Sequence, residues 1–505
     1  MERQVAERRL DELWTEIRDL RSTEDLLQWD QETYMPPGAL AARSRMLSTL
    51  AALKHRLLVA PELREVLDAC ADFAEEGSAL AGAVRCARLD VDRAVRVPET
   101  LVRDLAVASS EGLAAWQEAR RRSEFSLFEK PLARLFDLRR QEAAAVEPEA
   151  STYDAMLHHF EPGASEADLA PVFEALGDTL RGWIRTVADH GTPLDEGRIR
   201  AHYPVAQQEA FGRDLARAIG FDFEAGRLDA SSHPFCTAMD PRDVRMTWRW
   251  MDDDFRSAVF GILHETGHGL YEQGLPQGER RSPGGDAVSL GIHESQSRLW
   301  ENHVGRSLGF WRFALGSFRE RFPDAPTFEA EELWPLLHTV EPSFIRVEAD
   351  EATYNLHVII RFEIERALCG GDLTVADLPA AWDDLYEKYL GIRADNAAQG
   401  VLQDIHWSMG MFGYFPTYTL GTLAAAQLFD CAKAELGDLE AAFERGEFQP
   451  LLSWLREKIH RHGGRYPAPE LLERATGQPL SSEPLLAYLK ESIEGAYPGV
   501  ELAAA

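Results

Sequence analysis

The stretch His264-Glu265-Thr266-Gly267-His268 decides both the fold and the chemistry expected of this chain. It lies within residues 253–272, which we predict to be a helix. Apolar residues recur there at helical spacing behind a run of aspartates that suits a helix N-terminus. Positions four apart share one helix face, so both imidazoles can reach one metal ion with Glu265 beside it. This pattern is typical of zinc peptidases, in which the glutamate takes a proton from water.

A catalytic zinc site takes three protein ligands and keeps one position open, so a third ligand is needed. The extended pattern with a third histidine fails, because Tyr271 and Gly274 stand where it requires Gly and His. Residues 292–298 begin a second helical segment with His293 next to Glu294. Adjacent helical positions point about 100° apart, so the two cannot easily both ligate. We choose Glu294, because two histidines with a glutamate form an established zinc set; the alternative is a surface glutamate.

The composition excludes several classes of partner. A formal net charge of −31 argues against nucleic acid and against anionic lipid, since both need a basic face. The five cysteines are widely spaced and form no C-x-x-C pair, which favours reduced thiols in a cytoplasmic protein. The N-terminus has no apolar signal core, and no apolar run is long enough to cross a membrane. We therefore expect a cytoplasmic protein without nucleic-acid or membrane partners.

The periodicity predicts a mainly α fold with a small β-sheet beside the His-Glu helix. Helical spacing runs from the N-terminus to about residue 157, and a break rich in Pro and Gly follows at residues 161–164. The strand material lies at residues 199–250, where residues 245–250 alternate polar and apolar. We expect one peptidase unit over residues 1–505, with a helical N-terminal part at 1–160 and a catalytic part with the zinc site at 161–505.

Further motifs make the chain resemble the Taq-type thermostable metallocarboxypeptidases, the thirty-second metallopeptidase family. They occur in the family's order and cover almost the whole chain. Besides His264 to His268, the matching stretches are Trp29-Asp30-Gln31-Glu32-Thr33-Tyr34-Met35-Pro36-Pro37, His233-Pro234-Phe235, Asp243-Val244-Arg245-Met246-Thr247, His293-Glu294-Ser295-Gln296-Ser297, Ile345-Arg346-Val347-Glu348-Ala349-Asp350-Glu351, Gly400-Val401-Leu402-Gln403-Asp404-Ile405-His406-Trp407 and Gly413-Tyr414-Phe415-Pro416-Thr417-Tyr418.

This resemblance implies a large helical fold with a deep substrate cleft, in which residues 1–160 form a cleft wall or lid. It also implies removal of single C-terminal amino acids from peptide substrates with broad specificity. The family uses Zn²⁺, or Co²⁺ in some members, and its members are usually homodimers. It is related to dipeptidyl carboxypeptidases and oligopeptidases, which share this chemistry but cut in a different register and are the nearest alternative.

A carboxypeptidase needs a cation for the terminal carboxylate of its substrate, and the planar fork of arginine suits this best. Within the family motif, Arg346 is the candidate for this substrate-binding role. The alternative is a structural helix pair with Asp350 at i+4. His233 is a second substrate-binding candidate, because the following Pro234 favours an extended, cleft-lining conformation. A histidine packed in the core is the alternative for His233.

The oxyanion of the tetrahedral intermediate needs a hydrogen-bond donor besides the metal. His406, Tyr414 and Tyr418 are the catalytic candidates, because related zinc peptidases use a His and a Tyr for this purpose. The spacing does not distinguish the two tyrosines, and either could be half-buried packing instead.

The predicted mechanism is hydrolysis at a zinc ion bound by His264, His268 and Glu294, with Glu265 as general base. A rival of another class is a catalytically silent zinc protein that acts as a scaffold. The retained Glu265 argues against it, since a structural zinc site needs no base and fills its fourth position.

Overall fold

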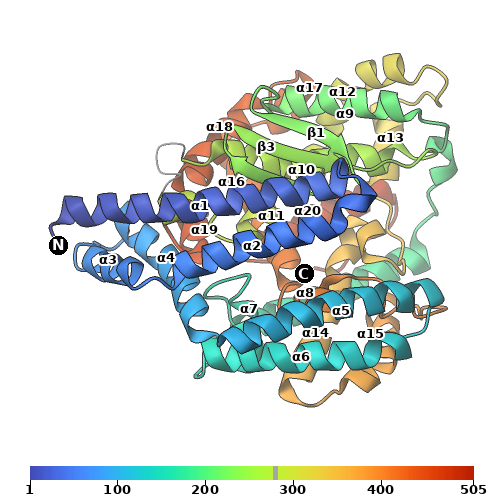
Figure 1. Cartoon of the computed structure of the whole chain (residues 1–505). Coiled ribbons are helices and arrows are strands. Elements are labelled where there is room, and N and C mark those ends of the chain that lie inside the picture. The colour runs from blue at the N-terminus through green and yellow to red at the C-terminus, as the bar shows by residue number, and fades with distance from the viewer. Residues whose placement is uncertain (277–281, 505) are drawn as a thin grey trace. The chain divides into compact units, whose positions relative to one another are not determined.

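The computed structural model describes residues 1–276 and 282–504 and is mainly helical, with one small sheet (Figure 1). The chain folds into two compact units, each assembled from three separate segments. The first unit comprises Met1–Val95, Asp195–Leu337 and Ala424–Leu480, and the second comprises Arg96–Leu194, His338–Leu423 and Ser481–Ala505. The predicted mainly α class is confirmed. The assignment of residues 1–160 to a cleft wall or lid stays a prediction.

The first unit holds the sheet and the longest helix of the described chain. Its helices are α1 (Arg3–Thr33), α2 (Leu40–Leu58), α3 (Pro61–Ala71), α4 (Ala79–Arg96), α9 (Val205–Ile219), α10 (Phe255–Gly274), α11 (Leu290–Arg298), α12 (Leu308–Arg321), α13 (Ala330–Leu337), α17 (Leu439–Glu444), α18 (Gln449–Lys458) and α19 (Ala468–Thr476). Short 3-10 turns at η1 (Pro37–Ala39), η2 (Glu196–Ile199), η3 (Pro283–Gly285) and η8 (His460–His462) join them, and η4 (Leu299–Val304) is a π-helical turn directly after α11.

The second unit is built from helices alone in the described residues. They are α5 (Glu99–Arg122), α6 (Ser126–Val146), α7 (Thr152–Leu157), α8 (Glu166–His190), α14 (Glu351–Gly370), α15 (Leu378–Leu390) and α20 (Glu483–Ala496), with 3-10 turns η5 (Arg346–Glu348), η6 (Val375–Asp377) and η7 (His406–Met409). Helix α16 (Pro416–Leu436) starts in this unit and continues into the first.

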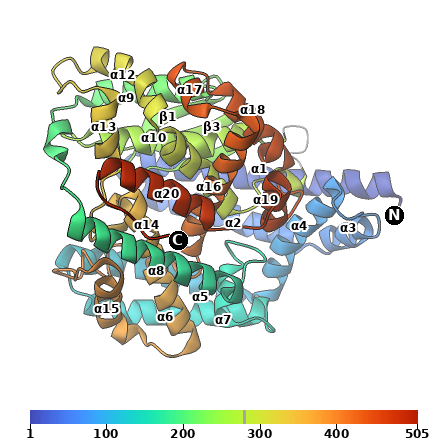
Figure 2. The same cartoon turned by 180° about the vertical axis from the view of Figure 1, so that it is seen from behind.

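The sheet lies where the sequence predicts strands. Its order is β1-β3-β2, with β1 (Gly226–Ala230) parallel and β2 (Cys236–Asp240) antiparallel to the central β3 (Asp243–Trp248). Helix α10 packs against β2 and β3, and Figures 1 and 2 show it beside β3 from opposite sides. The sheet is therefore beside the His-Glu helix, as expected. The alternating pattern was expected to reach residue 250, but β3 ends two residues earlier at Trp248.

Helix α10 forms for the reasons read from the sequence, with its bounds shifted by two residues. The Asp254 side chain caps it by accepting a hydrogen bond from the backbone N–H of Arg256. The helix then continues to Gly274. The side chains of Ile262 and Leu263 are fully buried, so tertiary packing on both sides stabilises the helix that carries the site.

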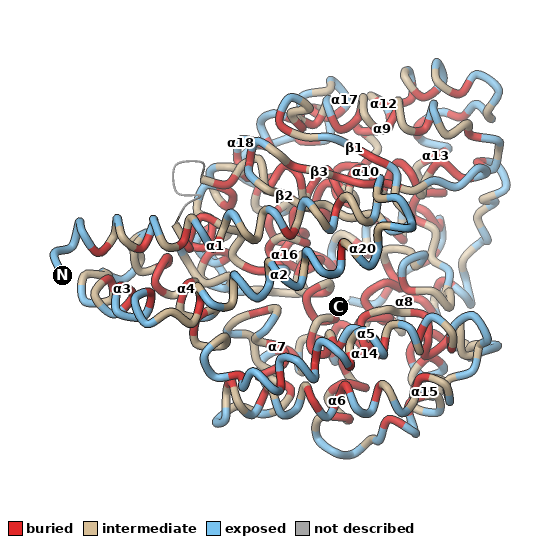
Figure 3. The backbone as a smooth tube through the Cα atoms, in the orientation of Figure 1, coloured by how far each residue is buried: buried red, intermediate tan, exposed pale blue. Residues whose placement is uncertain are grey.

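Most residues of α10, and of α14 in the second unit, are buried (Figure 3). Helix α14 is buried over most of its length and includes the polar side chains Asn355, His357, Arg361 and Glu365, none of which is solvent-exposed. Buried charged groups need partners, so the polar side chains of α14 indicate a buried polar site. Among the described residues, no helix has both the length and the apolar character that crossing a membrane would require.

Candidate active site

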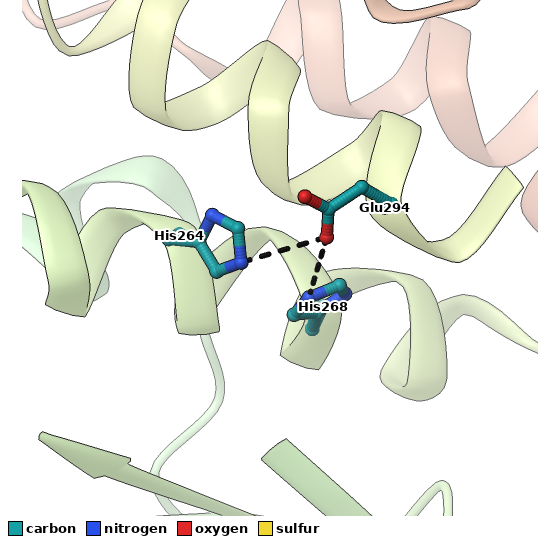
Figure 4. A group of neighbouring side chains, drawn as sticks. All are labelled: His264, His268 and Glu294. Carbon is teal, nitrogen blue, oxygen red and sulfur yellow. Dashed lines mark ion pairs between the residues drawn. The ribbon is translucent and has the colours of Figure 1, made fainter. Parts of the chain in front are cut away.

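The predicted metal ligands come together where α10 meets α11. His264 and His268 from α10 and Glu294 from α11 offer donor atoms that all lie within 4.8 Å of one another. Glu294 Oε2 is 3.6 Å from His264 Nε2 and 3.5 Å from His268 Nε2, so one oxygen faces both rings (Figure 4). Donors about 2.1 Å from a tetrahedral ion lie roughly 3.4 Å apart. The donor set and its spacing therefore fit a divalent metal such as zinc.

Gly267 explains why the third ligand can come from α11. A Cβ at this position would lie 2.5 Å from the carbonyl oxygen of Gln296 and 2.6 Å from the Cα of Ser297. Real Cβ atoms do not approach backbone so closely, so only glycine allows α10 and α11 to pack at this distance. Glycine within a helix normally costs stability. Its presence inside the motif was thus a sequence signal for a close helix neighbour, one that the sequence reasoning missed.

Each of the two histidines has a defined partner for its Nδ1 atom. His264 Nδ1 is 2.8 Å from Glu301 Oε2. His268 Nδ1 faces His293, whose carbonyl oxygen is 3.0 Å away and whose ring Nδ1 is 2.5 Å away. Donation from Nδ1–H leaves the Nε2 lone pair of each ring for a metal. His293, the alternative third ligand, instead has its Nε2 3.1 Å from Glu272.

Glu265 follows His264 in α10 and is not one of the three grouped donors. Its side chain is buried, and its Oε2 has no hydrogen-bond partner among the described residues. Burial raises the pKa of Glu265 to about 7; His264 opposes the rise, and the carboxylates of Glu294 and Glu301 add to it. A carboxyl group with a pKa near neutrality can both accept and return a proton under physiological conditions.

In the second unit, Arg346 forms a buried ion cluster instead of the helix pair considered from the sequence. Its Nε and Nη2 donate to Asp404 Oδ1 over 3.1 and 2.9 Å, and its Nη1 donates to Tyr354 over 2.9 Å. Asp350, the i+4 alternative, instead caps α14 by accepting the backbone N–H groups of Ala352 and Thr353. Arg346 is 4% exposed, so this cluster is a buried one.

The cluster around Asp404 carries an excess of positive charge. Arg361 pairs with the other oxygen of Asp404 over 2.7 Å. Burial alone would raise the pKa of Asp404, but the Arg346 and Arg361 guanidinium groups hold it well below its ordinary value. Burial, together with the same two arginines, lowers the pKa of His406 to about 3 against the pull of Asp404. Two arginines thus face one carboxylate and a neutral imidazole, which favours binding of an anion.

The three candidate oxyanion donors lie together with Arg346. His406 Nε2 is 3.2 Å from the Tyr418 hydroxyl. The His406 and Tyr414 rings have centroids 5.1 Å apart, and those of Tyr414 and Tyr418 are 5.3 Å apart. The guanidinium of Arg346 is 4.7 Å from the centre of the Tyr418 ring. The structure therefore groups residues that the sequence only placed in neighbouring motifs.

Among the described residues, the His233 ring has no contact with these clusters. It is exposed in the connection between β1 and β2, and its carbonyl oxygen accepts a hydrogen bond from Ser231. Packing in the core, the alternative considered for this residue, is therefore wrong.

Comparison with known proteins agrees with this geometry. The profile of the Carboxypeptidase Taq (M32) metallopeptidase family matches residues 9–493. The chain belongs to this family. It is therefore a metallocarboxypeptidase, a peptide hydrolase, and the resemblance predicted from the motifs is confirmed.

Its relatives cover nearly the full chain. It is 43% identical to thermostable carboxypeptidase 1 of Thermus thermophilus, over 98% of this chain and 99% of the relative. It is 37% identical to thermostable carboxypeptidase 1 of Pyrococcus furiosus, over 93% and 94% of the two chains. The crystal structure of the M32 carboxypeptidase from Deinococcus radiodurans R1 superposes with a TM-score of 0.93 at 39% identity, covering 98% of this chain and 99% of that one. The fold of this carboxypeptidase is thus that of its family.

Proposed function

We propose that this carboxypeptidase is a zinc enzyme of broad specificity in which His264, His268 and Glu294 hold the ion. The observation that carries this proposal is the convergence of their donor atoms, with the unpartnered carboxyl of Glu265 beside them. Two imidazoles and one carboxylate suit Zn²⁺, and Co²⁺ accepts the same donors. When bound, such an ion acts as a Lewis acid that polarises the scissile carbonyl group and acidifies water.

Glu265 is the general base and then the general acid of the proposed mechanism. Its buried carboxylate accepts the proton of the attacking water and carries it to the nitrogen of the leaving amino acid. The pKa of about 7 that burial gives this group suits both transfers. Within the described part of the chain, Oε2 of Glu265 makes no hydrogen bond that would have to break before it accepts the proton.

Arg346 is proposed to bind the terminal carboxylate of the peptide. Arginine has five N–H donors, and three of its nitrogens each make one described bond, to Asp404 or Tyr354. The remaining N–H groups can donate to an incoming carboxylate. Its negative charge would balance the excess positive charge, because Arg346 and Arg361 share a single aspartate. Recognition of a free carboxylate would restrict cleavage to the last peptide bond.

His406 and Tyr418 are the proposed donors to the oxyanion of the tetrahedral intermediate. The low pKa of His406 keeps its ring neutral, with a single N–H to donate. The 3.2 Å contact between them uses the donor hydrogen of one of the two groups, and this hydrogen would turn to the oxyanion when the intermediate forms. Tyr414 packs against the same ring and is the alternative tyrosine. His233, exposed before β2, is proposed to contact the peptide chain.

We also propose a cytoplasmic location and a homodimeric assembly. The five cysteines are free thiols, which suits a reducing compartment. The dimer rests on the family resemblance alone, and light scattering of the purified protein would measure it.

The experiment that tests the reaction is mass spectrometry of N-blocked peptides incubated with the zinc-loaded enzyme. We expect products shortened by one residue at a time from the C-terminus, for many different terminal side chains. The Glu265→Gln enzyme is the matched control and should leave the peptides intact. Release of dipeptides, or cleavage at internal bonds, would contradict the proposal. A requirement for one particular terminal residue would overturn the broad specificity.

A further inference from the structure

Two charged side chains that follow the ligand Glu294 point back to the proposed metal site. Arg298, at the end of α11, donates from Nε to Glu294 Oε1 over 2.7 Å and from Nη1 to Glu301 Oε2 over 3.2 Å. Glu301, in the π-helical turn η4, lies 2.8 Å from His264 Nδ1 through the same oxygen. One arginine therefore links the carboxylate ligand to the carboxylate that contacts a histidine ligand.

We propose that Glu301 and Arg298 are positioning residues that fix the geometry of the metal ligands. Glu301 accepts the Nδ1–H of His264, and this sets the ring orientation and leaves Nε2 free for the ion. Arg298 occupies Oε1 of Glu294, so that only Oε2 is directed at the two imidazoles. This inference rests on the proposed function, because it needs the ion to bind at His264, His268 and Glu294.

The contacts of Glu294 explain why an arginine is useful at this place. A free carboxylate can bind a zinc ion through one oxygen or through both, and the second mode uses a position that substrate and water need. Oε2 faces both histidine ligands, at 3.6 and 3.5 Å, and also lies 3.1 Å from the Ser297 hydroxyl. Oε1 is held by Arg298. Ligation through Oε2 alone keeps the fourth position of the ion available.

Attraction of the metal cannot be the reason for Arg298, because its charge repels a cation. If it acted through charge alone, its removal would strengthen metal binding. If Arg298 is a positioning residue, its removal should instead change which oxygen atoms of Glu294 bind the ion. The spectra of the Arg298 variants below distinguish these two explanations.

The first experiment measures metal affinity by competition with a chromogenic chelator. Glu301→Gln and Glu301→Ala should weaken zinc binding about 10–100-fold, the usual effect of losing such a partner. The matched control is Glu24→Gln, a buried glutamate of α1 whose ion partner is Lys54; its affinity should equal that of the parent. Melting of the metal-free variants checks that each one is folded. Equal affinity of the Glu301 variants and the parent would overturn the role of Glu301.

A second variant separates this inference from the ligand assignment itself. His264→Ala removes a proposed ligand and should lose zinc far more severely than any Glu301 variant. If His264→Ala binds zinc as the parent does, the proposed site is wrong. If it loses zinc and Glu301→Gln does not, only the positioning role fails.

The third measurement is the visible absorption spectrum of the Co²⁺-loaded protein, which reports the coordination number. Four-coordinate Co²⁺ absorbs more strongly than five-coordinate Co²⁺. Arg298→Gln should therefore weaken the absorption, because Oε1 of Glu294 becomes free to bind the ion. Arg298→Lys should restore much of the intensity, since an ammonium group can still pair with Oε1. An Arg298→Gln spectrum identical to that of the parent would overturn the role of Arg298.

Discussion

The two compact units each bury a cluster of charges, and the two clusters have opposite excess charge. In the first unit, the carboxylates of Glu265, Glu294 and Glu301 lie around the proposed histidine ligands, and Arg298 and Arg306 are their cationic partners. Acids exceed bases at this place. A buried site of this kind gains most from a cation, and its imidazole and carboxylate donors suit a metal ion.

The second unit reverses the balance. Arg346 and Arg361 converge on Asp404, and the neighbouring His406 is neutral because its pKa is lowered to about 3. This cluster gains most from an anion, such as the carboxylate that ends every peptide. The sign of the excess buried charge therefore indicates which class of ligand each cluster would bind.

Removal of the metal is expected to have the largest effect on the enzyme. Chelation should abolish peptidase activity, because the acidic cluster then lacks the cation that its chemistry needs. It should leave the helical fold in place, since a 505-residue core does not depend on one ion. Activity and far-ultraviolet circular dichroism before and after chelation measure the two effects. Addition of Zn²⁺ or Co²⁺ should restore turnover, and full activity of a preparation free of metal would contradict the mechanism.

The next largest effect is expected from Glu265→Gln. This variant keeps the shape of the side chain but loses the base and acid functions, so kcat should fall roughly 10²–10⁴-fold. Zinc content should stay at one equivalent per chain, because Glu265 offers no ligand in the proposed site. Metal analysis alongside kinetics distinguishes the roles. Loss of zinc together with activity would make Glu265 a ligand.

In the cationic cluster, Arg346→Ala should weaken cleavage of peptides with a free terminal carboxylate. The desolvated substrate charge loses a partner worth roughly 2–4 kcal/mol, and this loss should appear in kcat/KM. Peptides with an amidated C-terminus lack that charge and serve as the internal control. They should lose much less activity in the variant. An equal loss on both kinds of peptide would assign Arg346 to structure alone.

The smallest expected effect concerns Glu365, which organises the segment that carries the oxyanion donors. It accepts hydrogen bonds from Trp407 Nε1 over 2.8 Å and from the Gly413 N–H over 3.0 Å. Burial raises its pKa to about 7, although these donors oppose the shift. The folded pKa lies above the ordinary value, so its contribution to stability is full below about pH 4.5 and is lost as the pH rises through 7.

The free energy of unfolding should therefore fall by roughly 2 kcal/mol between pH 5 and pH 7 because of Glu365. Urea unfolding of the parent and of Glu365→Gln at both values measures this contribution as the difference between their slopes with pH. Asp404, whose pKa is depressed, acts in the opposite sense and loses its contribution as the pH falls below its ordinary range. If the free energy of unfolding had the same pH dependence in Glu365→Gln and the parent, the Glu365 carboxyl would be ionised in the folded protein over the whole range from pH 5 to pH 7.

Local patterns in the sequence selected three side chains that the structure places close together in the acidic cluster. The spacing of His264 and His268 on one helix is a local property. Helix stereochemistry indicated that His293 and Glu294 would not both be ligands, and Glu294 was chosen because two histidines and a glutamate form an established zinc set. The sheet beside α10 followed from the same reasoning. These features depend on residues close together in the chain, whose relation is fixed by the helical repeat.

The surroundings of the ligands could not be predicted in this way. The partner of Arg346 is Asp404, 58 residues later, whereas the i+4 rule pointed to Asp350. Both acids have the right chemistry, and only tertiary packing decides between them. Glu301 was missed because its approach to His264 depends on how α10 and α11 cross. That crossing depends in turn on the absence of a side chain at Gly267.

The π-helical turn at Leu299–Val304 makes the number of residues after Glu294 important. A π turn holds one residue more than an α-helical turn. Deletion of Leu299 or Trp300 with the wide turn kept in place would move every later side chain by one helical position, about 100° around the axis. An acid at position 301 would then turn away from His264 even though no ligand had been changed. The length of this short segment, as much as the identity of its residues, would thus be under selection, and an insertion or deletion here should be tolerated less than a substitution.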